Sequence, residues 1–276
     1  MVIRNREYDF DKHTYVMGIL NMTPDSFSDG GKWNENVSAR KHVQDMIEKG
    51  AAIIDVGGES TRPGFDKISC EEEINRTIPI ISWIRENYPD ILISIDTTKA
   101  AVAKAALEAG ADIINDVSGL YEDADMASVA AKYDAYVCLM HNGLYFDKNY
   151  SGEPHEEGYL EKEMKMMLDN ALASGIKKER IILDPGVGFG KTQEENAQIL
   201  ANLGELHSLG CPLLLGTSRK SVFGFLTGLQ VNDRLEGTMV ASVLAVQARY
   251  AVVRVHDVEE NYRAVRTMEE IRKWTR

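Results

Sequence analysis

The stretches Leu92-Ile-Ser-Ile-Asp96 and Ile113-Ile-Asn-Asp116 show the pattern that decides the fold. Each is a short apolar run, rich in β-branched residues, that ends in polar residues. Such a run, bounded by turn-forming residues and followed by a segment with helical spacing, is typical of a buried parallel strand in an α/β sheet. The two stretches therefore predict two strands of a parallel sheet, and similar runs occur along the whole chain.

Eight runs of this kind alternate with longer amphipathic segments, among them Ala39–Lys49, Glu71–Asn87 and Leu160–Ser174. The runs are Tyr15–Leu20, Ala52–Val56, Leu92–Asp96, Ile113–Asp116, Ala135–Met140, Ile181–Asp184, Leu213–Gly216 and Val252–Val255. Eight strand-helix repeats predict closure of the sheet into a (β/α)₈ TIM barrel. The 276 residues suit one such barrel, so we expect a single domain over residues 1–276.

An open, doubly wound sheet is the alternative topology, and the loop after the first strand argues against it. An open sheet of that type usually has fewer strands and a glycine-rich dinucleotide turn at this point. The chain instead has Asn21-Met-Thr-Pro-Asp-Ser-Phe-Ser-Asp-Gly-Gly31, which is polar and longer than a strand-helix connection requires. We expect this loop to be functional and mobile, and Glu59–Gly64, after the second strand, to be a second long functional loop.

Composition limits the partners and the compartment. The net charge is −12, which argues against a nucleic-acid partner or an anionic membrane, because both require a contiguous basic surface. Cys70, Cys138 and Cys211 lie far apart without a CxxC pair, so they predict neither a disulfide framework nor a zinc site. No signal peptide or membrane-spanning run is evident. We expect a soluble, cytoplasmic protein that acts on small molecules.

Polar residues at strand ends predict a site for a flat heterocycle. The carboxyl ends of barrel strands form the active-site mouth. Asp96, Asn115 and Asp184 stand at three such ends, and Lys220 follows a fourth. A single acid after a strand most often caps a helix or fixes a turn. Together, however, carboxylates that accept paired N–H bonds and a lysine that donates to a carbonyl suit a nitrogen-rich ring. We call these four residues the heterocycle set.

A second group of residues predicts an anion site. Arg62, Arg254 and His256, together with Asn21, lie in or beside the loops after the first, second and eighth strands. Exposure to solvent would explain isolated arginines, but their shared place in an acidic chain indicates an anion. Barrels often bind phosphate near their last strands, so we expect a phosphorylated substrate. We call these four residues the anion set.

The segment Gly186-Val-Gly-Phe-Gly-Lys-Thr192 resembles a nucleotide-binding loop only superficially. A P-loop has four residues between its first glycine and Gly-Lys-Thr, whereas Gly186 and Gly190 enclose three. We therefore expect the glycines to let the backbone approach a flat ligand, with Phe189 offering an apolar face. Packing of Phe189 in the core is the alternative.

Several segments between residues 15 and 260 closely resemble the pterin-binding segments of dihydropteroate synthases. They are Gly18-Ile-Leu-Asn-Met-Thr-Pro-Asp-Ser-Phe-Ser-Asp-Gly-Gly31, Asp55-Val-Gly-Gly-Glu-Ser-Thr-Arg-Pro-Gly64, Ser94-Ile-Asp-Thr97, Ile114-Asn-Asp-Val-Ser-Gly119, Asp184-Pro-Gly-Val-Gly-Phe-Gly-Lys-Thr192, Gly216-Thr-Ser-Arg-Lys-Ser221, Arg234-Leu-Glu-Gly-Thr238 and Arg254-Val-His-Asp257. The chain departs from the family's segments at Met140-His-Asn-Gly-Leu-Tyr145, which leaves the role of the fifth loop open.

The resemblance implies a reaction and a role for each set. The reaction is the condensation of 6-hydroxymethyl-7,8-dihydropterin pyrophosphate with p-aminobenzoate, by an SN1-like route. The heterocycle set would hold the pterin, and the anion set would hold the pyrophosphate with Mg²⁺, the metal lying at Asn21. Thr61, Phe189, Ser218 and Lys220 would border the p-aminobenzoate site. Asp29, Arg62 and Lys220 would be the catalytic residues, with Asp29 stabilising a pterin cation. The resemblance also implies a homodimer.

Two other functions remain open at this point. Pterin-binding methyltransferase domains, which pass a methyl group to a corrinoid partner, share the barrel and several of the acidic and amide positions. A barrel that binds pterin without catalysis is the second alternative. Ser218-Arg-Lys220 and Arg254-Val-His256 are the segments that favour the synthase.

Overall fold

The protein is described by a computed structural model that covers residues 2–4, 6–23, 31–59 and 67–274. Eight parallel strands form its centre, in the order β8-β7-β6-β5-β4-β3-β10-β9. The strands are β3 (Tyr15–Asn21), β4 (Ile53–Gly57), β5 (Leu92–Asp96), β6 (Ile113–Asp116), β7 (Tyr136–Met140), β8 (Ile181–Asp184), β9 (Leu214–Gly216) and β10 (Val252–Val255). The eight predicted strands are confirmed, each to within one residue at either end.

The sheet closes between its two outer strands. Leu183 of β8 forms a parallel bridge with Leu213, the residue before β9, and its backbone N–H donates to the carbonyl of Pro212 over 2.9 Å. The ring of strands is therefore complete, as predicted for a (β/α)₈ barrel. Its carboxyl end collects the residues at which the strands finish.

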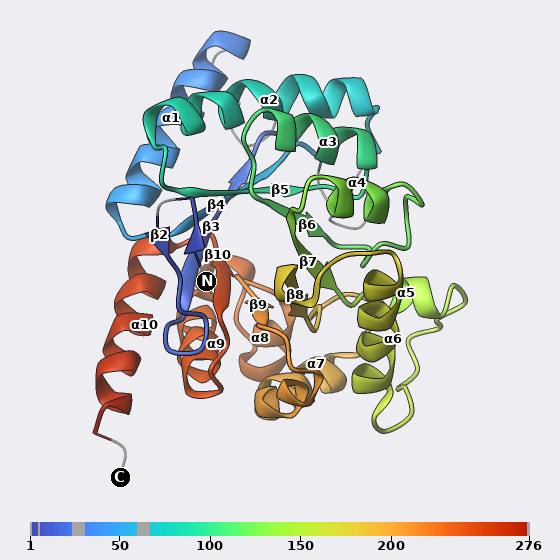
Figure 1. Ribbon diagram of the computed structural model, residues 1–276. Coiled ribbons are helices and arrows are strands. Elements are labelled where there is room, and N and C mark those ends of the chain that lie inside the picture. The colour runs from blue at the N-terminus through green and yellow to red at the C-terminus, as the bar shows by residue number, and fades with distance from the viewer. Residues whose placement is uncertain (1, 5, 24–30, 60–66, 275–276) are drawn as a thin grey trace.

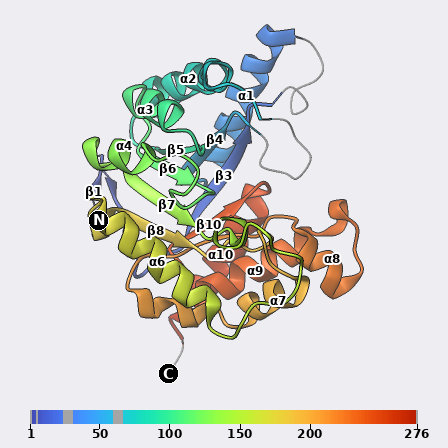
Figure 2. The ribbon, with the colours of Figure 1, turned by 90° about the vertical axis from the view of Figure 1, so that its right-hand side faces the viewer.

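Helices follow the strands and cover the outside of the barrel (Figure 1). They are α1 (Gly31–Glu48), α2 (Cys70–Asn87), α3 (Ala100–Glu108), α4 (Met126–Lys132), α5 (Gly143–Phe146), α6 (Tyr159–Ala173), α7 (Gln193–Ala201), α8 (Ser221–Thr227), α9 (Leu235–Gln247) and α10 (Val258–Arg272). In Figure 2 the strands run between α1–α3 above and α6–α10 below. Short 3₁₀ turns occupy Lys178–Arg180, Leu203–Leu209 and Val231–Asp233.

Alternate residues of each strand face opposite sides of the barrel wall. In β4, Ile54 and Val56 pack outward with the helices, whereas Ile53 packs inside the barrel. Asp55 lies two residues beyond Ile53 on the same side, and its side chain is fully buried. The strand sequences are apolar without alternation because each face of a strand packs into a separate core. The polar residues of the inner face lie near the carboxyl ends of the strands.

An N-terminal hairpin, which the sequence did not predict, closes the amino end of the barrel. Strands β1 (Val2–Ile3) and β2 (Arg6–Glu7) pair antiparallel, at the left edge of Figure 2. Ile3 and the following Tyr8 and Phe10 pack with the first inward-facing residues of the strands. Periodicity could not predict strands of two residues, because alternation needs about four residues to be recognised.

Candidate functional site

The inner face of the barrel gathers a connected polar cluster at the carboxyl ends of β4, β5, β6 and β10. Asp55 Oδ2 accepts a hydrogen bond from Asn115 Nδ2 over 3.1 Å and from Arg254 Nε over 2.6 Å. The other end of the same guanidinium, Nη2, donates to Asp96 Oδ2 over 2.6 Å. Asp96 and Asn115, predicted to share one mouth, are brought together as expected.

Arg254 lies within this cluster, and the sequence did not predict these contacts. The sequence pattern predicts Arg254 beside an anion and Asp96 beside a heterocycle, yet the two side chains are directly paired. It also gave no role to Asp55, which pairs with Arg254 as well. The available signal was the position of Asp55, two residues after Ile53 on the inner face of a strand. The heterocycle and anion sets therefore meet in one cluster.

Three buried polar atoms of β4 and β5 have no hydrogen-bond partner among the described residues. They are Asp55 Oδ1, Asp96 Oδ1 and Ser94 Oγ. A buried polar atom without a partner costs about 1–3 kcal/mol, so a fold retains such atoms where they have a use. Two of the three are carboxylate oxygens, which only accept hydrogen bonds when ionised. They suit a ligand edge that carries N–H donors.

The buried charges shift the proton equilibria of the cluster. Burial raises the pKa of Asp96 to about 7, although the positive charge of Arg254 acts in the opposite direction. Burial alone would lower the pKa of Arg254, but Asp55 and Asp96 more than offset it and raise that pKa. The guanidinium therefore stays charged and provides a fixed cation at the centre of the mouth.

A second group joins the ends of β8 and β9. Asp184 is buried, and its Oδ1 accepts from the backbone N–H of Gly186 over 2.7 Å. Lys220, at the start of α8, donates to the carbonyl of Val187, and its Nζ lies 4.5 Å from the centre of the Phe189 ring. The predicted residues Asp184, Phe189 and Lys220 thus surround one loop.

Burial also changes the titration of these two charged groups. It raises the pKa of Asp184, an effect that the positive charge of Lys220 partly offsets. It lowers the pKa of Lys220 to about 8, with Asp184 acting in the opposite direction and Arg254 in the same direction. The three groups are therefore electrostatically coupled, and Lys220 lies close to its titration range at neutral pH.

Ser218 and His256 contact each other at the ends of β9 and β10. Ser218 Oγ accepts from the backbone N–H of His256 over 3.1 Å and lies 2.9 Å from His256 Nδ1. The resemblance placed these residues against different substrates, p-aminobenzoate and pyrophosphate. In the structure the two positions share one hydrogen-bonded pair, so ligands held by them would be neighbours.

Asn21, the last residue of β3, lies at the same mouth. Asn21 Oδ1 and Asp96 Oδ2 both lie near Gly57 of β4, each 3.8 Å from the point where a Cβ atom on this glycine would be. The two side chains therefore flank the same glycine. The described residues contain no cluster of three or more His, Cys, Asp or Glu side chains that could enclose a metal ion. Mg²⁺ usually takes one or two protein oxygens together with substrate phosphate and water. The amide oxygen of Asn21 fits that limited role.

Three predicted site residues, Asp29, Thr61 and Arg62, lie outside the described residues. They belong to the loops after the first and second barrel strands. Their predicted roles at the mouth therefore stay predictions. Within the described residues, no helix is long and apolar enough to cross a membrane.

The arrangement defines a class of protein. Acceptors for a ring edge lie beside a fixed cation at the mouth of a (β/α)₈ barrel, and the family model described as "Pterin binding enzyme" matches residues 17–256. A dihydropteroate synthase of Clostridium beijerinckii is 51% identical over 267 residues, which cover 96% of this chain and 97% of that protein. The chain belongs to the dihydropteroate synthase family of pterin-binding enzymes.

Other relatives agree with this assignment. The dihydropteroate synthase of Bacillus subtilis is 44% identical over 94% of this chain and 89% of its own length. The Clostridium difficile enzyme, solved in the presence of pteroic acid, superposes with a TM-score of 0.88 at 48% identity, covering 96% of this chain and 99% of that one. The Yersinia pestis enzyme, solved with a sulfonamide drug complex, has a TM-score of 0.89 at 40% identity, with 99% of each chain covered.

Proposed function

We propose that this enzyme condenses 6-hydroxymethyl-7,8-dihydropterin pyrophosphate with p-aminobenzoate, giving 7,8-dihydropteroate and pyrophosphate in folate biosynthesis. One observation carries this proposal: two carboxylate oxygens beside Arg254, Asp55 Oδ1 and Asp96 Oδ1, have no hydrogen-bond partner in the part of the chain that the structure describes. A pterin presents an amino group and ring N–H groups along one edge. Carboxylates that accept these donors would satisfy the buried oxygens and orient the ring.

The heterocycle set supplies the remaining contacts to the pterin in this proposal. Asp184 accepts N–H groups at another edge, and Lys220 donates to the ring carbonyl. Asn115 is buried and already donates to Asp55, which leaves its amide oxygen as an acceptor. In this proposal the barrel wall provides hydrogen-bond partners around a flat ring.

The anion set binds the pyrophosphate of the same substrate. Arg254 is paired with Asp55 and Asp96, and His256 follows it by two residues, directly after the end of β10. Arg62, from the loop after the second barrel strand, would add a further cation. Mg²⁺ would be held by Asn21 together with the substrate's own phosphate oxygens, and when bound it neutralises charge on the leaving group.

The reaction follows from this distribution of charge. The bond between the pterin methylene carbon and the bridging oxygen breaks, and its electron pair leaves with pyrophosphate. Arg254 stabilises the charge that develops on this oxygen, while the dihydropterin ring spreads the positive charge left on the methylene carbon, with Asp29 stabilising it. The amine nitrogen of p-aminobenzoate then forms the C–N bond and loses a proton. The route needs no covalent enzyme intermediate.

p-Aminobenzoate binds beside Phe189 and Lys220 in this proposal. The Phe189 ring offers an apolar face close to the lysine ammonium. Ser218 receives the carboxylate at the outer end, and Thr61 borders the site from the loop after the second barrel strand. The direct contact between Ser218 and His256 would place this substrate next to the pyrophosphate, as the reaction requires.

The test mixes the purified protein with the pterin pyrophosphate, p-aminobenzoate and Mg²⁺, and measures pyrophosphate and dihydropteroate. We expect both products, and we expect no dihydropteroate when p-aminobenzoate is omitted. Methyl transfer from a methylated pterin to a corrinoid, without dependence on p-aminobenzoate, would instead support the methyltransferase alternative. Omitting Mg²⁺ should lower the rate, and an unchanged rate after chelation would contradict the metal's proposed role.

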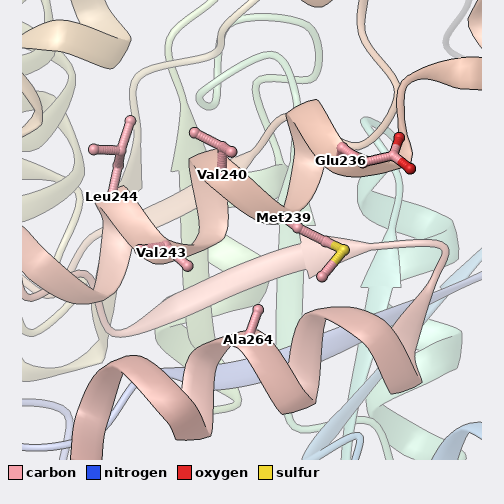
Figure 3. Close-up of a pocket in the computed structure, with 6 residues that line it drawn as sticks. All are labelled: Glu236, Met239, Val240, Val243, Leu244 and Ala264. Carbon is pink, nitrogen blue, oxygen red and sulfur yellow. The ribbon is translucent and has the colours of Figure 1, made fainter. Parts of the chain in front are cut away.

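The exposed face of α9 supports a homodimer. Met239, Val240, Val243 and Leu244 line a pocket of about 350 Å³ with Ala264 of α10. In Figure 3, Met239 and Val243 extend from α9 toward Ala264. Val240 is 58% exposed, and an exposed apolar helix face of this kind suits a self-complementary contact with a second copy. Val240→Glu should convert a dimer into a monomer in analytical ultracentrifugation, and a monomeric parent protein would contradict the proposal.

A further inference from the structure

Lys191 ties together two loops at the mouth of the barrel. It follows the turn after β8, and only 8% of its surface is exposed. Its Nζ lies 2.8 Å from His141 Nδ1, in the segment after β7, and donates to three backbone carbonyls. The carbonyls belong to His141, Gly186 and Phe189, at distances of 3.2, 3.0 and 3.0 Å. One buried amine therefore contacts four acceptors from both loops.

These acceptors define the charge states of the cluster. A lysine ammonium only donates, so the contact requires His141 Nδ1 to accept. The proton of neutral His141 then resides on Nε2, which lies 2.7 Å from Glu163 Oε2 of α6. Burial, and the nearby charge of Lys191, hold the pKa of His141 low, at about 4. The histidine thus connects the cation to a carboxylate while remaining uncharged.

The ammonium form of Lys191 suits this environment better than the neutral amine. Burial lowers the pKa of Lys191 to about 7, and Asp184 acts in the opposite direction. Four acceptors within 3.2 Å nevertheless favour the form with the most hydrogens, because a neutral amine has only two to donate. Removal of the cation would leave buried carbonyls without a donor.

The two loops are packed backbone to backbone around Lys191. A Cβ atom on Gly186, whose φ is +64°, would lie 1.8 Å from the carbonyl oxygen of His141. A Cβ atom on Gly190, whose φ is +58°, would lie 2.7 Å from the backbone nitrogen of Leu144. Only glycine permits such proximity together with a left-handed φ. Carbonyl oxygens from both loops come close together at this contact, and the lysine ammonium donates hydrogen bonds to them.

The loop after β8, which Lys191 contacts, also contacts residues of the proposed substrate site. Its Gly186 N–H donates to Asp184, and its Val187 carbonyl accepts from Lys220. Its Phe189 ring lies against the same lysine. Displacement of this loop would therefore move the wall proposed for p-aminobenzoate. It would disturb three members of the heterocycle set less, because Asp96, Asn115 and Asp184 are fixed by the sheet. The fourth member, Lys220, contacts the loop and borders both substrates in the proposed function.

We propose that Lys191 is a positioning residue for the synthase reaction, acting through the loop after β8 to hold Phe189 and Lys220 against p-aminobenzoate. This inference rests on the proposed function for its kinetic consequence. It does not require Lys191 to touch either substrate. His141 and Glu163 support the cation from the side opposite the loop.

The variant Lys191→Met tests this role, because methionine keeps an unbranched stem and removes the ammonium. The variant loses the hydrogen bonds to the Gly186 and Phe189 carbonyls of the loop after β8, and the loss of one to two such bonds corresponds to about a tenfold effect. We expect the KM for p-aminobenzoate to rise about tenfold, while the KM for the pterin pyrophosphate changes less than about threefold. Equal changes in both KM values, or none in a folded variant, would overturn the inference.

Two control variants separate positioning from general destabilisation. Lys165→Met removes an exposed lysine paired with Asp169 on α6, and should leave both KM values unchanged. Val265→Ala creates a cavity under α10, away from the two loops, and lowers the melting temperature without touching them. If Val265→Ala raised the KM for p-aminobenzoate as much as Lys191→Met, the effect would be general and the inference wrong.

Hydrogen exchange gives a readout that does not depend on catalysis. The N–H groups of Gly188 and Phe189 are bonded to Asn196 Oδ1 and to the Gly186 carbonyl. Their exchange should be at least about tenfold faster in Lys191→Met, and unchanged in Lys165→Met. Unchanged exchange in Lys191→Met would overturn the inference, whether or not the parent protein has synthase activity. Absence of synthase activity in the parent protein would refute only the proposed function.

If Lys191→Met does not fold, Glu163→Gln provides the same test with a smaller perturbation. It keeps an oxygen acceptor for His141 Nε2 and removes only the compensating charge. The exchange of Gly188 and Phe189 should still quicken, by about two- to threefold, with a matching rise in the KM for p-aminobenzoate. No change in either quantity would contradict the proposed role.

Discussion

The two ends of the barrel are built from the same strands and differ in what fills them. At the amino end, Ile53, Leu92 and Val252 pack with Tyr8 and Phe10 of the N-terminal segment. At the carboxyl end, two to four residues later, the same strands present Asp55, Asp96 and Arg254. The amino end is an apolar core, whereas the carboxyl end holds buried charges and oxygens that no described residue satisfies.

This difference shows how stability and function are divided along one strand. Burial of apolar side chains stabilises the amino end, at about 1.5–3 kcal/mol for each large side chain. Burial of charges at the carboxyl end is at best close to neutral for stability, since desolvation opposes the ion pairs. Changes at the amino end should therefore alter stability alone, and changes at the carboxyl end should alter activity first.

Tyr8→Ala should give the largest effect and should fall on stability only. Tyr8 is fully buried and its ring centre lies 5.1 Å from that of Tyr15. By analogy with Phe→Ala in cores, the free energy of unfolding should fall by about 3–5 kcal/mol. Urea denaturation measures the loss, and kcat/KM at 25 °C should match the parent enzyme. A proportionate loss of kcat/KM would remove the distinction between the two ends.

Arg254→Ala should reverse that pattern. It removes the cation proposed to stabilise the leaving group, a loss of about 2.7–4 kcal/mol or 10²–10³-fold in kcat by analogy with oxyanion donors. Steady-state kinetics with the pterin pyrophosphate measures it. Arg263→Ala removes an exposed arginine paired with Glu259 and is the matched control, for which kcat should be unchanged. Turnover of Arg254→Ala at the parent rate would refute the anion site.

The sequence predicted the strands so well because two independent signals coincide in them. Each strand is largely apolar on both faces, which marks it as buried in a parallel sheet, and polar residues near its end or just after it mark the mouth. β1, β2 and the short helix α5 gave neither signal. The first two are too short for periodicity, and α5 begins in the fifth loop, where the chain departs from the family's segments.

The site was predicted as a collection of residues but not as a set of contacts. Strand-end position placed Asp96, Asn115 and Asp184 at one mouth, because the topology fixes where strands finish. The direct pairing of Arg254 with Asp55 and Asp96 depends on side-chain packing across the barrel, to which no local pattern in the sequence corresponds. The contacts of Lys191 were not predictable for the same reason. Its Nζ donates to the carbonyls of Gly186 and Phe189 in its own loop, whereas the lysine of a P-loop contacts a phosphate.

Asp184→Asn should sharpen the assignment of the heterocycle set. Asparagine keeps an oxygen that can accept from Gly186, so the loop after β8 should hold its position. The other oxygen becomes a donor that faces the N–H groups of the pterin. We expect the binding free energy of the pterin to weaken by about 1–3 kcal/mol, which raises its Kd about 5–150-fold in isothermal titration calorimetry. The exposed variant Asp169→Asn is the control, and unchanged affinity in Asp184→Asn would exclude this residue from the pterin site.

The pH dependence should give the smallest effect and identify the cation that titrates. Burial lowers the pKa of Lys220 to about 8, so the lysine is charged below that pH and loses its proton as the pH rises through it. Since kcat/KM reports groups of the free enzyme, it should fall above about pH 8, approaching tenfold per pH unit. Lys220→Arg should abolish this limb whatever its absolute rate, because arginine keeps its charge. A fall above pH 8 that persisted unchanged in Lys220→Arg would exclude Lys220 as the titrating cation of the carboxyl end.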